Sequence, residues 1–100
     1  MITKNEILKL IANRKDDLQK MGVRDIGLFG SYARNDQVEM SDIDILIDFY
    51  PEKETYDNLM AVYDLLEKLF AGKKVEVVTK NGLSPYIGPS ILKDMVTTDL

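Results

Sequence analysis

The sequence of 100 residues contains neither cysteine nor histidine. Without cysteine, the chain has no disulfide, no thiolate zinc or iron–sulfur site and no cysteine nucleophile. Without histidine, it has no Ser-His-Asp or Cys-His catalytic pair and no imidazole ligand for a metal. A bound metal would therefore take oxygen ligands, which favours a hard ion such as Mg²⁺ or Mn²⁺. A general base would be a carboxylate, a lysine or a tyrosine.

Basic charge is also scarce, with 13 lysines and arginines against 17 acidic residues and a net charge of −4. A broad basic surface is not predicted, so we expect no direct binding of nucleic acid. The acids gather in segment 35–54, where seven carboxylates accompany one lysine. Such a segment is either a solvated loop or a binding site for a cation.

Long apolar runs are missing as well. The N-terminal segment MITKNEILKL lacks the apolar core of a signal peptide, and no run approaches the length of a membrane span. We therefore expect a cytoplasmic protein that does not bind membranes. A chain of 100 residues fits one domain, which we place at residues 1–100.

Apolar residues recur with helical spacing in some segments and alternate with polar residues in others. The predicted helices span residues 3–20, 32–34, 55–70 and 88–96, and the predicted strands span residues 25–29, 41–49 and 74–79. Thr3 and Glu6 have the spacing of a capping box, and Gly22 suits a left-handed helix cap. The alternation of elements predicts an α/β or α+β fold, a small mixed sheet of about three or four strands with helices packed on it.

Gly30 and Ser31 directly follow a predicted strand. A glycine there lets the backbone approach a ligand closely, and the N–H groups that follow can bind an anion. Ser31 would add a hydroxyl. The alternative is an ordinary turn between a strand and a helix, with the serine as its cap.

Two aspartates alternate with isoleucine in the segment Ser41–Asp44. The period of two points Asp42 and Asp44 the same way, with Cα atoms roughly 6–7 Å apart. Carboxylates that close repel each other unless a cation or water intervenes, so the pair indicates either a divalent metal site or a solvent-facing strand. Glu76 could reach the same face from a neighbouring strand, to bind metal or to accept a proton, or it could simply be exposed.

Arg34 follows Ser31 by one helical turn and could reach the same phosphate, since a guanidinium suits phosphate oxygens. Its alternative is a surface arginine paired with the acidic loop. Ser41 could donate a hydrogen bond to a phosphate or merely open the strand. Gly30, Ser31, Arg34 and Ser41 are therefore the candidate phosphate-binding residues.

Taken together, Gly30–Arg34 and Ser41–Asp44 resemble the signature of the polymerase-β-like nucleotidyltransferase superfamily. The short length, the strand sequence VEVVT and the segment 83–89 resemble one branch, the minimal nucleotidyltransferases of prokaryotes. The resemblance covers Asp25–Val96. It implies the polymerase-β-like nucleotidyltransferase fold.

The resemblance also implies roles for individual residues. Gly30 and Ser31 would hold the phosphates of ATP, and Asp42 and Asp44 would bind Mg²⁺. Glu76 stands where the family has its third catalytic carboxylate, so that three acids would share catalysis and metal binding.

Members of this branch are often the antitoxin of a toxin–antitoxin pair, which implies a small helical HEPN-domain ribonuclease toxin as the partner. The antitoxin would transfer AMP from ATP to a tyrosine of that toxin. A first alternative is an impaired enzyme that neutralises its partner by binding alone, through Ile91, Leu92 and Met95 or around Tyr86–Ile87. A second is a nucleotidyltransferase that acts on a small molecule.

The sequence departs from the family pattern at two positions. Glu76 stands where aspartate is usual, and the extra methylene displaces its carboxylate, which matters because Mg²⁺ is strict about geometry. Asn35 stands where glycine usually follows the arginine. Asparagine tolerates a left-handed backbone better than most residues, so this second change is predicted to be mild.

Overall fold

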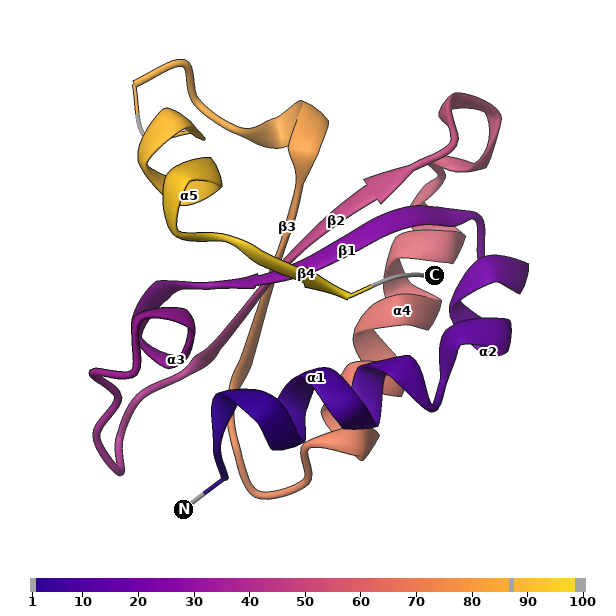
Figure 1. Ribbon diagram of the computed structural model, residues 1–100. Coiled ribbons are helices and arrows are strands. Elements are labelled where there is room, and N and C mark those ends of the chain that lie inside the picture. Colours follow the sequence, from indigo (N-terminus) through magenta and orange to yellow (C-terminus); the bar gives the residue numbers. More distant parts are fainter. Residues whose placement is uncertain (1, 87, 99–100) are drawn as a thin grey trace.

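A computed structural model describes residues 2–86 and 88–98 of the chain, and a four-stranded sheet forms its centre (Figure 1). The strands are β1 (Val23–Phe29), β2 (Ile43–Phe49), β3 (Val75–Thr79) and β4 (Val96–Thr98), in the order β3-β2-β1-β4. The helices are α1 (Lys4–Ala12), α2 (Lys15–Lys20), α3 (Gly30–Arg34), α4 (Tyr56–Leu69) and α5 (Gly88–Asp94), with 3₁₀ turns η1 (Pro51–Lys53) and η2 (Lys80–Gly82). The predicted α/β class and the mixed sheet are confirmed.

Strand direction follows from the lengths of the connections. β1 lies antiparallel to both β2 and β4, whereas β2 and β3 are parallel and are joined through α4. A parallel pair requires such a long crossover, and a helix is its usual content. The crossover brings the starts of β2 and β3 to the same edge of the sheet.

Strand β4 was not predicted, because the last helix was expected to run to residue 96. Helix α5 instead ends at Asp94, and Val96–Thr98 pairs with β1, with Val96 opposite Leu28. Three residues are too few to show a strand periodicity in the sequence. Of the segment 83–89 named above, Ile87 lies outside the described residues.

The predicted helix over residues 3–20 is also wrong in one respect, because it is interrupted at Asn13 and Arg14. No glycine or proline marks this break. The capping box is confirmed: Thr3 Oγ1 accepts a hydrogen bond from the Glu6 N–H at 3.2 Å, and Glu6 Oε1 accepts one from the Thr3 N–H at 3.1 Å. Gly22 follows α2 with a φ of +88°, as expected for a left-handed cap.

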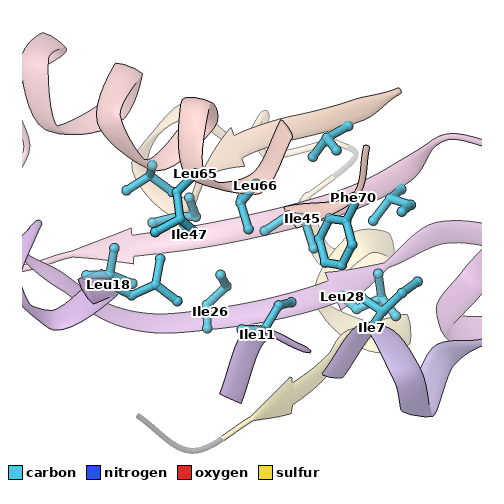
Figure 2. Close-up of a cluster of buried hydrophobic side chains, with 14 of the residues drawn as sticks. Ile7, Ile11, Leu18, Ile26, Leu28, Ile45, Ile47, Leu65, Leu66 and Phe70 are labelled. Atoms are coloured by element: carbon cyan, nitrogen blue, oxygen red, sulfur yellow. The ribbon is translucent and has the colours of Figure 1, made fainter. Parts of the chain in front are cut away.

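The core lies between one face of the sheet and helices α1, α2 and α4 (Figures 1 and 2). Ile43, Ile45 and Ile47 of β2 point into it and are fully buried, as their alternation predicts. The opposite face of the sheet is partly covered by α5. There Met95 packs on Gly27 so closely that a Cβ at Gly27 would lie 2.6 Å from Met95 Cγ.

None of the described helices is both long enough and apolar enough to cross a membrane.

Candidate active site

The predicted site residues meet where β1 ends and where β2 and β3 begin. Phe29 of β1 pairs with Asp44 of β2, and Asp44 pairs in turn with Glu76 of β3. Paired residues on neighbouring strands are about 5 Å apart. Since Ile43 and Val75 point into the core, Asp44 and Glu76 project from the opposite face. The structure therefore places Glu76 beside Asp44, the arrangement on which its predicted role depends.

Gly30 lies directly against the Asp44 carboxylate. Its φ is +74°, a left-handed conformation that L side chains rarely adopt, and a Cβ at this position would overlap Asp44 Oδ2. Both the conformation and the close approach require glycine. The two parts of the sequence signature, Gly30-Ser31 and Asp42-Ile43-Asp44, are thus in contact.

Asp44 is the carboxylate of this face whose pKa is shifted by its surroundings. Burial is the largest cause of a pKa of Asp44 that is raised to about 6; the nearby charges of Glu76 and Asp42 contribute to the rise, and Arg34 opposes it. Asp42 is partly exposed, with Lys74 Nζ 3.9 Å from its Oδ2. The three carboxylates therefore lie within electrostatic reach of one another.

These acids fit a hard divalent cation by their chemistry. Asp44 forms no ion pair within residues 2–86 and 88–98, and a crowded carboxylate of raised pKa is stabilised by such an ion. No three acidic side chains of the described segments converge as ligands of a single ion. Mg²⁺ commonly takes one or two carboxylates and keeps several waters, so Asp42 and Asp44 would be enough by number to hold it. Glu76 as a third metal ligand stays a prediction.

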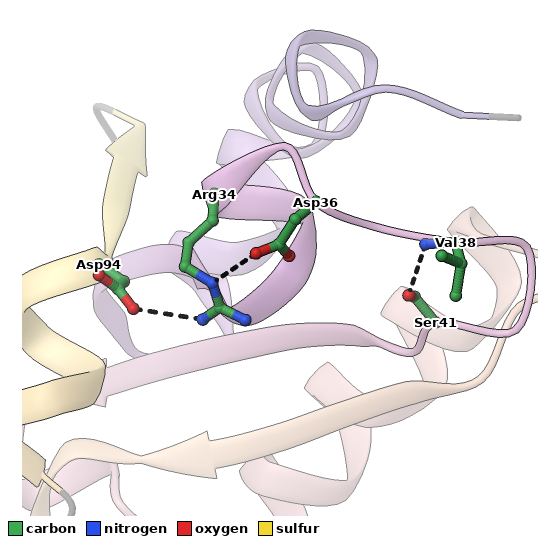
Figure 3. Close-up of polar contacts among 5 residues, drawn as sticks. All are labelled: Arg34, Asp36, Val38, Ser41 and Asp94. Atoms are coloured by element: carbon green, nitrogen blue, oxygen red, sulfur yellow. Dashed lines mark hydrogen bonds and ion pairs between the residues drawn. The ribbon is translucent and has the colours of Figure 1, made fainter.

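Arg34 lies at the last turn of α3, between two carboxylates (Figure 3). Its Nε donates to Asp36 Oδ2 at 3.1 Å and its Nη1 donates to Asp94 Oδ2 at 3.2 Å. Hydrogen bonds to these two acids raise the pKa of Arg34 above its usual value. The pairing with the acidic loop was one of the sequence alternatives. Asp94 was not foreseen, because it is 60 residues away in the chain and no local pattern links it to Arg34.

Ser41 is engaged in the loop that precedes β2 (Figure 3). Its Oγ accepts a hydrogen bond from the Val38 N–H at 2.9 Å, and its own N–H donates to the Val38 carbonyl. The hydroxyl hydrogen remains available for another acceptor. Asn35 ends α3 with a φ of 63°, so the substitution of glycine by asparagine is accommodated by the left-handed backbone that the sequence predicted.

Two hollows lie near these elements. The larger, about 870 Å³, is lined by residues 2, 39–40 and 69–73 and includes none of the predicted site residues. The smaller, about 270 Å³, lies on the carboxylate-bearing face and is lined by Leu46 and Asp48 of β2 together with Leu92 and Met95. Leu92 of α5 thus borders a hollow and is also exposed.

Comparison with known proteins assigns the chain to a family. The family of the nucleotidyltransferase domain matches residues 8–97. The protein adenylyltransferase MntA of Thermococcus cleftensis is 38% identical over 99 residues, covering 96% of both chains. A candidate protein adenylyltransferase of Methanocaldococcus jannaschii is 42% identical over 98 residues, covering 96% of this chain and 98% of the relative. The solved structure of a candidate minimal nucleotidyltransferase superposes with a TM-score of 0.71 at 27% identity, covering 89% of this chain and 93% of the other.

Proposed function

This chain belongs to the nucleotidyltransferase domain family, and from that premise we propose that it transfers AMP from ATP to a tyrosine hydroxyl of a partner protein. The observation that carries the proposal is the Asp44 carboxylate, held against Gly30 and beside Glu76. The relatives that match over nearly their whole length carry the name protein adenylyltransferase, which supports a protein as the acceptor.

The nucleotide is proposed to bind at the junction of β1 and α3. Gly30 leaves the backbone open to a close approach by phosphate oxygens, and Ser31 adds a hydroxyl. Arg34, one helical turn further on, supplies a positive charge at the same edge. The hydroxyl hydrogen of Ser41, the residue before Asp42, is a further donor.

Asp42 and Asp44 would hold Mg²⁺ or Mn²⁺, and such an ion would neutralise charge on the phosphates when bound. Asp44 would bind the cation as a carboxylate anion, so it has to lose its proton before the cation and the nucleotide bind. Glu76 accepts the proton of the attacking tyrosine hydroxyl. The bond from the tyrosine oxygen to the α-phosphorus forms as the bond between the α-phosphorus and the bridging oxygen breaks, and pyrophosphate leaves. Positioning and charge neutralisation supply most of the rate.

The acceptor is proposed to be a HEPN-domain ribonuclease toxin, with this chain as its antitoxin. The support is the resemblance to minimal nucleotidyltransferases, whose partners are often such toxins. Addition of AMP to a tyrosine brings a bulky charged group to the toxin surface, which would interfere with the binding of RNA.

Intact-mass spectrometry tests the proposal. The purified protein is mixed at a substoichiometric amount with the protein encoded by the neighbouring gene, together with ATP and Mg²⁺. We expect the partner to gain the mass of AMP, and the gain to vanish with EDTA or in the variant Asp42→Asn/Asp44→Asn.

The matched control is Asp57→Asn/Asp64→Asn, which removes two exposed carboxylates from α4. This variant should transfer AMP normally. A stable complex without any gain in mass would contradict the proposal and favour neutralisation by binding alone. Retained transfer in Asp42→Asn/Asp44→Asn would overturn the assigned chemistry.

A further inference from the structure

We infer that Asp94, the last residue of α5, is a positioning residue that holds the Arg34 guanidinium ready for the nucleotide phosphates. The inference rests on the proposed function, because it takes Arg34 as a phosphate ligand. It adds a residue from a distant element, since Asp94 is 60 residues from Arg34 in the chain and ends the helix that precedes β4.

Two of the three guanidinium nitrogens of Arg34 donate hydrogen bonds to carboxylates. Asp36 accepts from Nε at 3.1 Å and Asp94 accepts from Nη1 at 3.2 Å (Figure 3). Within the described segments, Nη2 has no hydrogen-bond partner in the protein. Two carboxylates therefore fix the plane of the guanidinium and leave two N–H groups of Nη2 for a ligand.

The fixed guanidinium acts on the catalytic face. Its positive charge opposes the rise in the pKa of Asp44, so the two groups are electrostatic neighbours. Arg34 is half-exposed, and a long exposed side chain ordinarily samples many rotamers. Restraining it before the ligand arrives lowers the entropy that binding would otherwise lose.

Helix stability does not explain an acid at this position. A helix C-terminus carries partial negative charge and favours cations, so Asp94 opposes the dipole of α5 where Lys93 complements it. Exposed ion pairs also contribute little to folding. What Asp94 does have is a tertiary partner, Arg34, and a firm anchor, because the adjacent Met95 packs on Gly27.

Binding measurements on the full chain test the inference without needing the acceptor. The probe is an ATP analogue with a methylene group between the α- and β-phosphates, titrated calorimetrically in Mg²⁺. Asp94→Asn should weaken binding about fivefold, and Arg34→Gln should weaken it more. In the double variant, Asp94→Asn should add nothing to Arg34→Gln, because Asp94 acts through Arg34.

Two further variants separate positioning from simple loss of charge. Asp64→Asn, on the exposed side of α4, should bind the analogue as the native protein does. Asp94→Glu keeps the charge and should recover part of the affinity. In steady state, Asp94→Asn should raise the KM for ATP and leave kcat nearly unchanged, because Asp94 does not touch the reacting atoms.

Unchanged or tighter binding by Asp94→Asn would overturn the inference, since it would mean that Asp94 is neutral or competes with the phosphates for Arg34. Additive losses in the double variant would also overturn it. A native protein that binds the analogue but modifies no partner would contradict the proposed acceptor, and the Asp94 comparison would still be decided by binding. A native protein that does not bind the analogue would overturn both.

Discussion

Asp44 and Asp48 lie on the same face of the same strand, four residues apart, and the protein treats them in opposite ways. Asp48 is 5% exposed and accepts a hydrogen bond from Arg24 Nη2 at 2.5 Å. Asp44 forms no ion pair in the part of the chain that the structure describes, and Glu76 and Asp42 raise its pKa rather than lower it. One carboxylate is neutralised by the fold, and the other is left for a ligand to neutralise.

The difference shows how one strand can serve both stability and function. The isoleucines of β2 supply its buried face along the whole length of the strand. The side chains on the opposite face of β2 can therefore have different surroundings at the Asp44 end and at the Asp48 end. At the Asp48 end the positive charge belongs to the protein, and at the Asp44 end we propose a cation that arrives with the nucleotide.

The largest expected difference between Asp44 and Asp48 is in the rate of AMP transfer after each aspartate is exchanged for asparagine. We expect Asp44→Asn to lower the rate of AMP transfer by roughly 10³-fold, since it removes a proposed ligand of the cation that would neutralise the phosphates. Asp48→Asn should transfer AMP at nearly the native rate but unfold at a lower urea concentration, because it loses the ion pair with Arg24. Single-turnover assays and urea titrations of both variants measure these effects. Equal activities of the two variants would refute the division of roles.

Gly30 and Gly72 allow a second comparison, between a glycine that lies against Asp44 and one that has open space around it. Both have positive φ, +74° and +89°, but a Cβ would overlap Asp44 at Gly30 and would meet nothing within 4 Å at Gly72. Gly72→Ala should therefore cost only the strain of a left-handed alanine, about 1 kcal/mol. Gly30→Ala adds the overlap, and we expect it to cost about 2–3 kcal/mol and to abolish transfer. Urea unfolding checks the pair, and equal costs would show that Asp44 moves aside freely.

The smallest expected effect is a gain in stability, and it depends on pH. Because the pKa of Asp44 is raised in the fold, its ionised form destabilises the native state. This penalty is absent below the unfolded pKa near 4, develops between pH 4 and about 6, and is complete above pH 6. Without divalent metal, Asp44→Asn should be more stable than the native protein by about 1 kcal/mol at pH 7.5, after allowance for screening by solvent, and equally stable at pH 3.5.

Urea titrations at the two pH values measure this gain, with Asp64→Asn as the control for loss of an exposed acid. The same difference in stability at both pH values would show that the charge of Asp44 is not the cause.

Much of the fold could be predicted because its signals are local. The capping box at Thr3, the burial of alternate isoleucines in β2 and the left-handed backbone at Asn35 each depend on neighbours within a few residues. The resemblance to minimal nucleotidyltransferases is confirmed by the family and by the solved structure. The break at Asn13 and the strand β4 were missed, since neither carries a local signal of its own. The catalytic, nucleotide and metal roles of the site residues stay predictions.

The sequence by itself determined that Asp44 projects from the face opposite the isoleucines, because the alternation of a strand is a property of the strand alone. Only the tertiary structure decided what surrounds it. Glu76 lies beside Asp44 through the register of two parallel strands, and Asp94 reaches Arg34 from a helix 60 residues away. Those distances depend on how α4 and α5 pack against the sheet, and packing is the sum of many contacts that no short stretch of sequence contains.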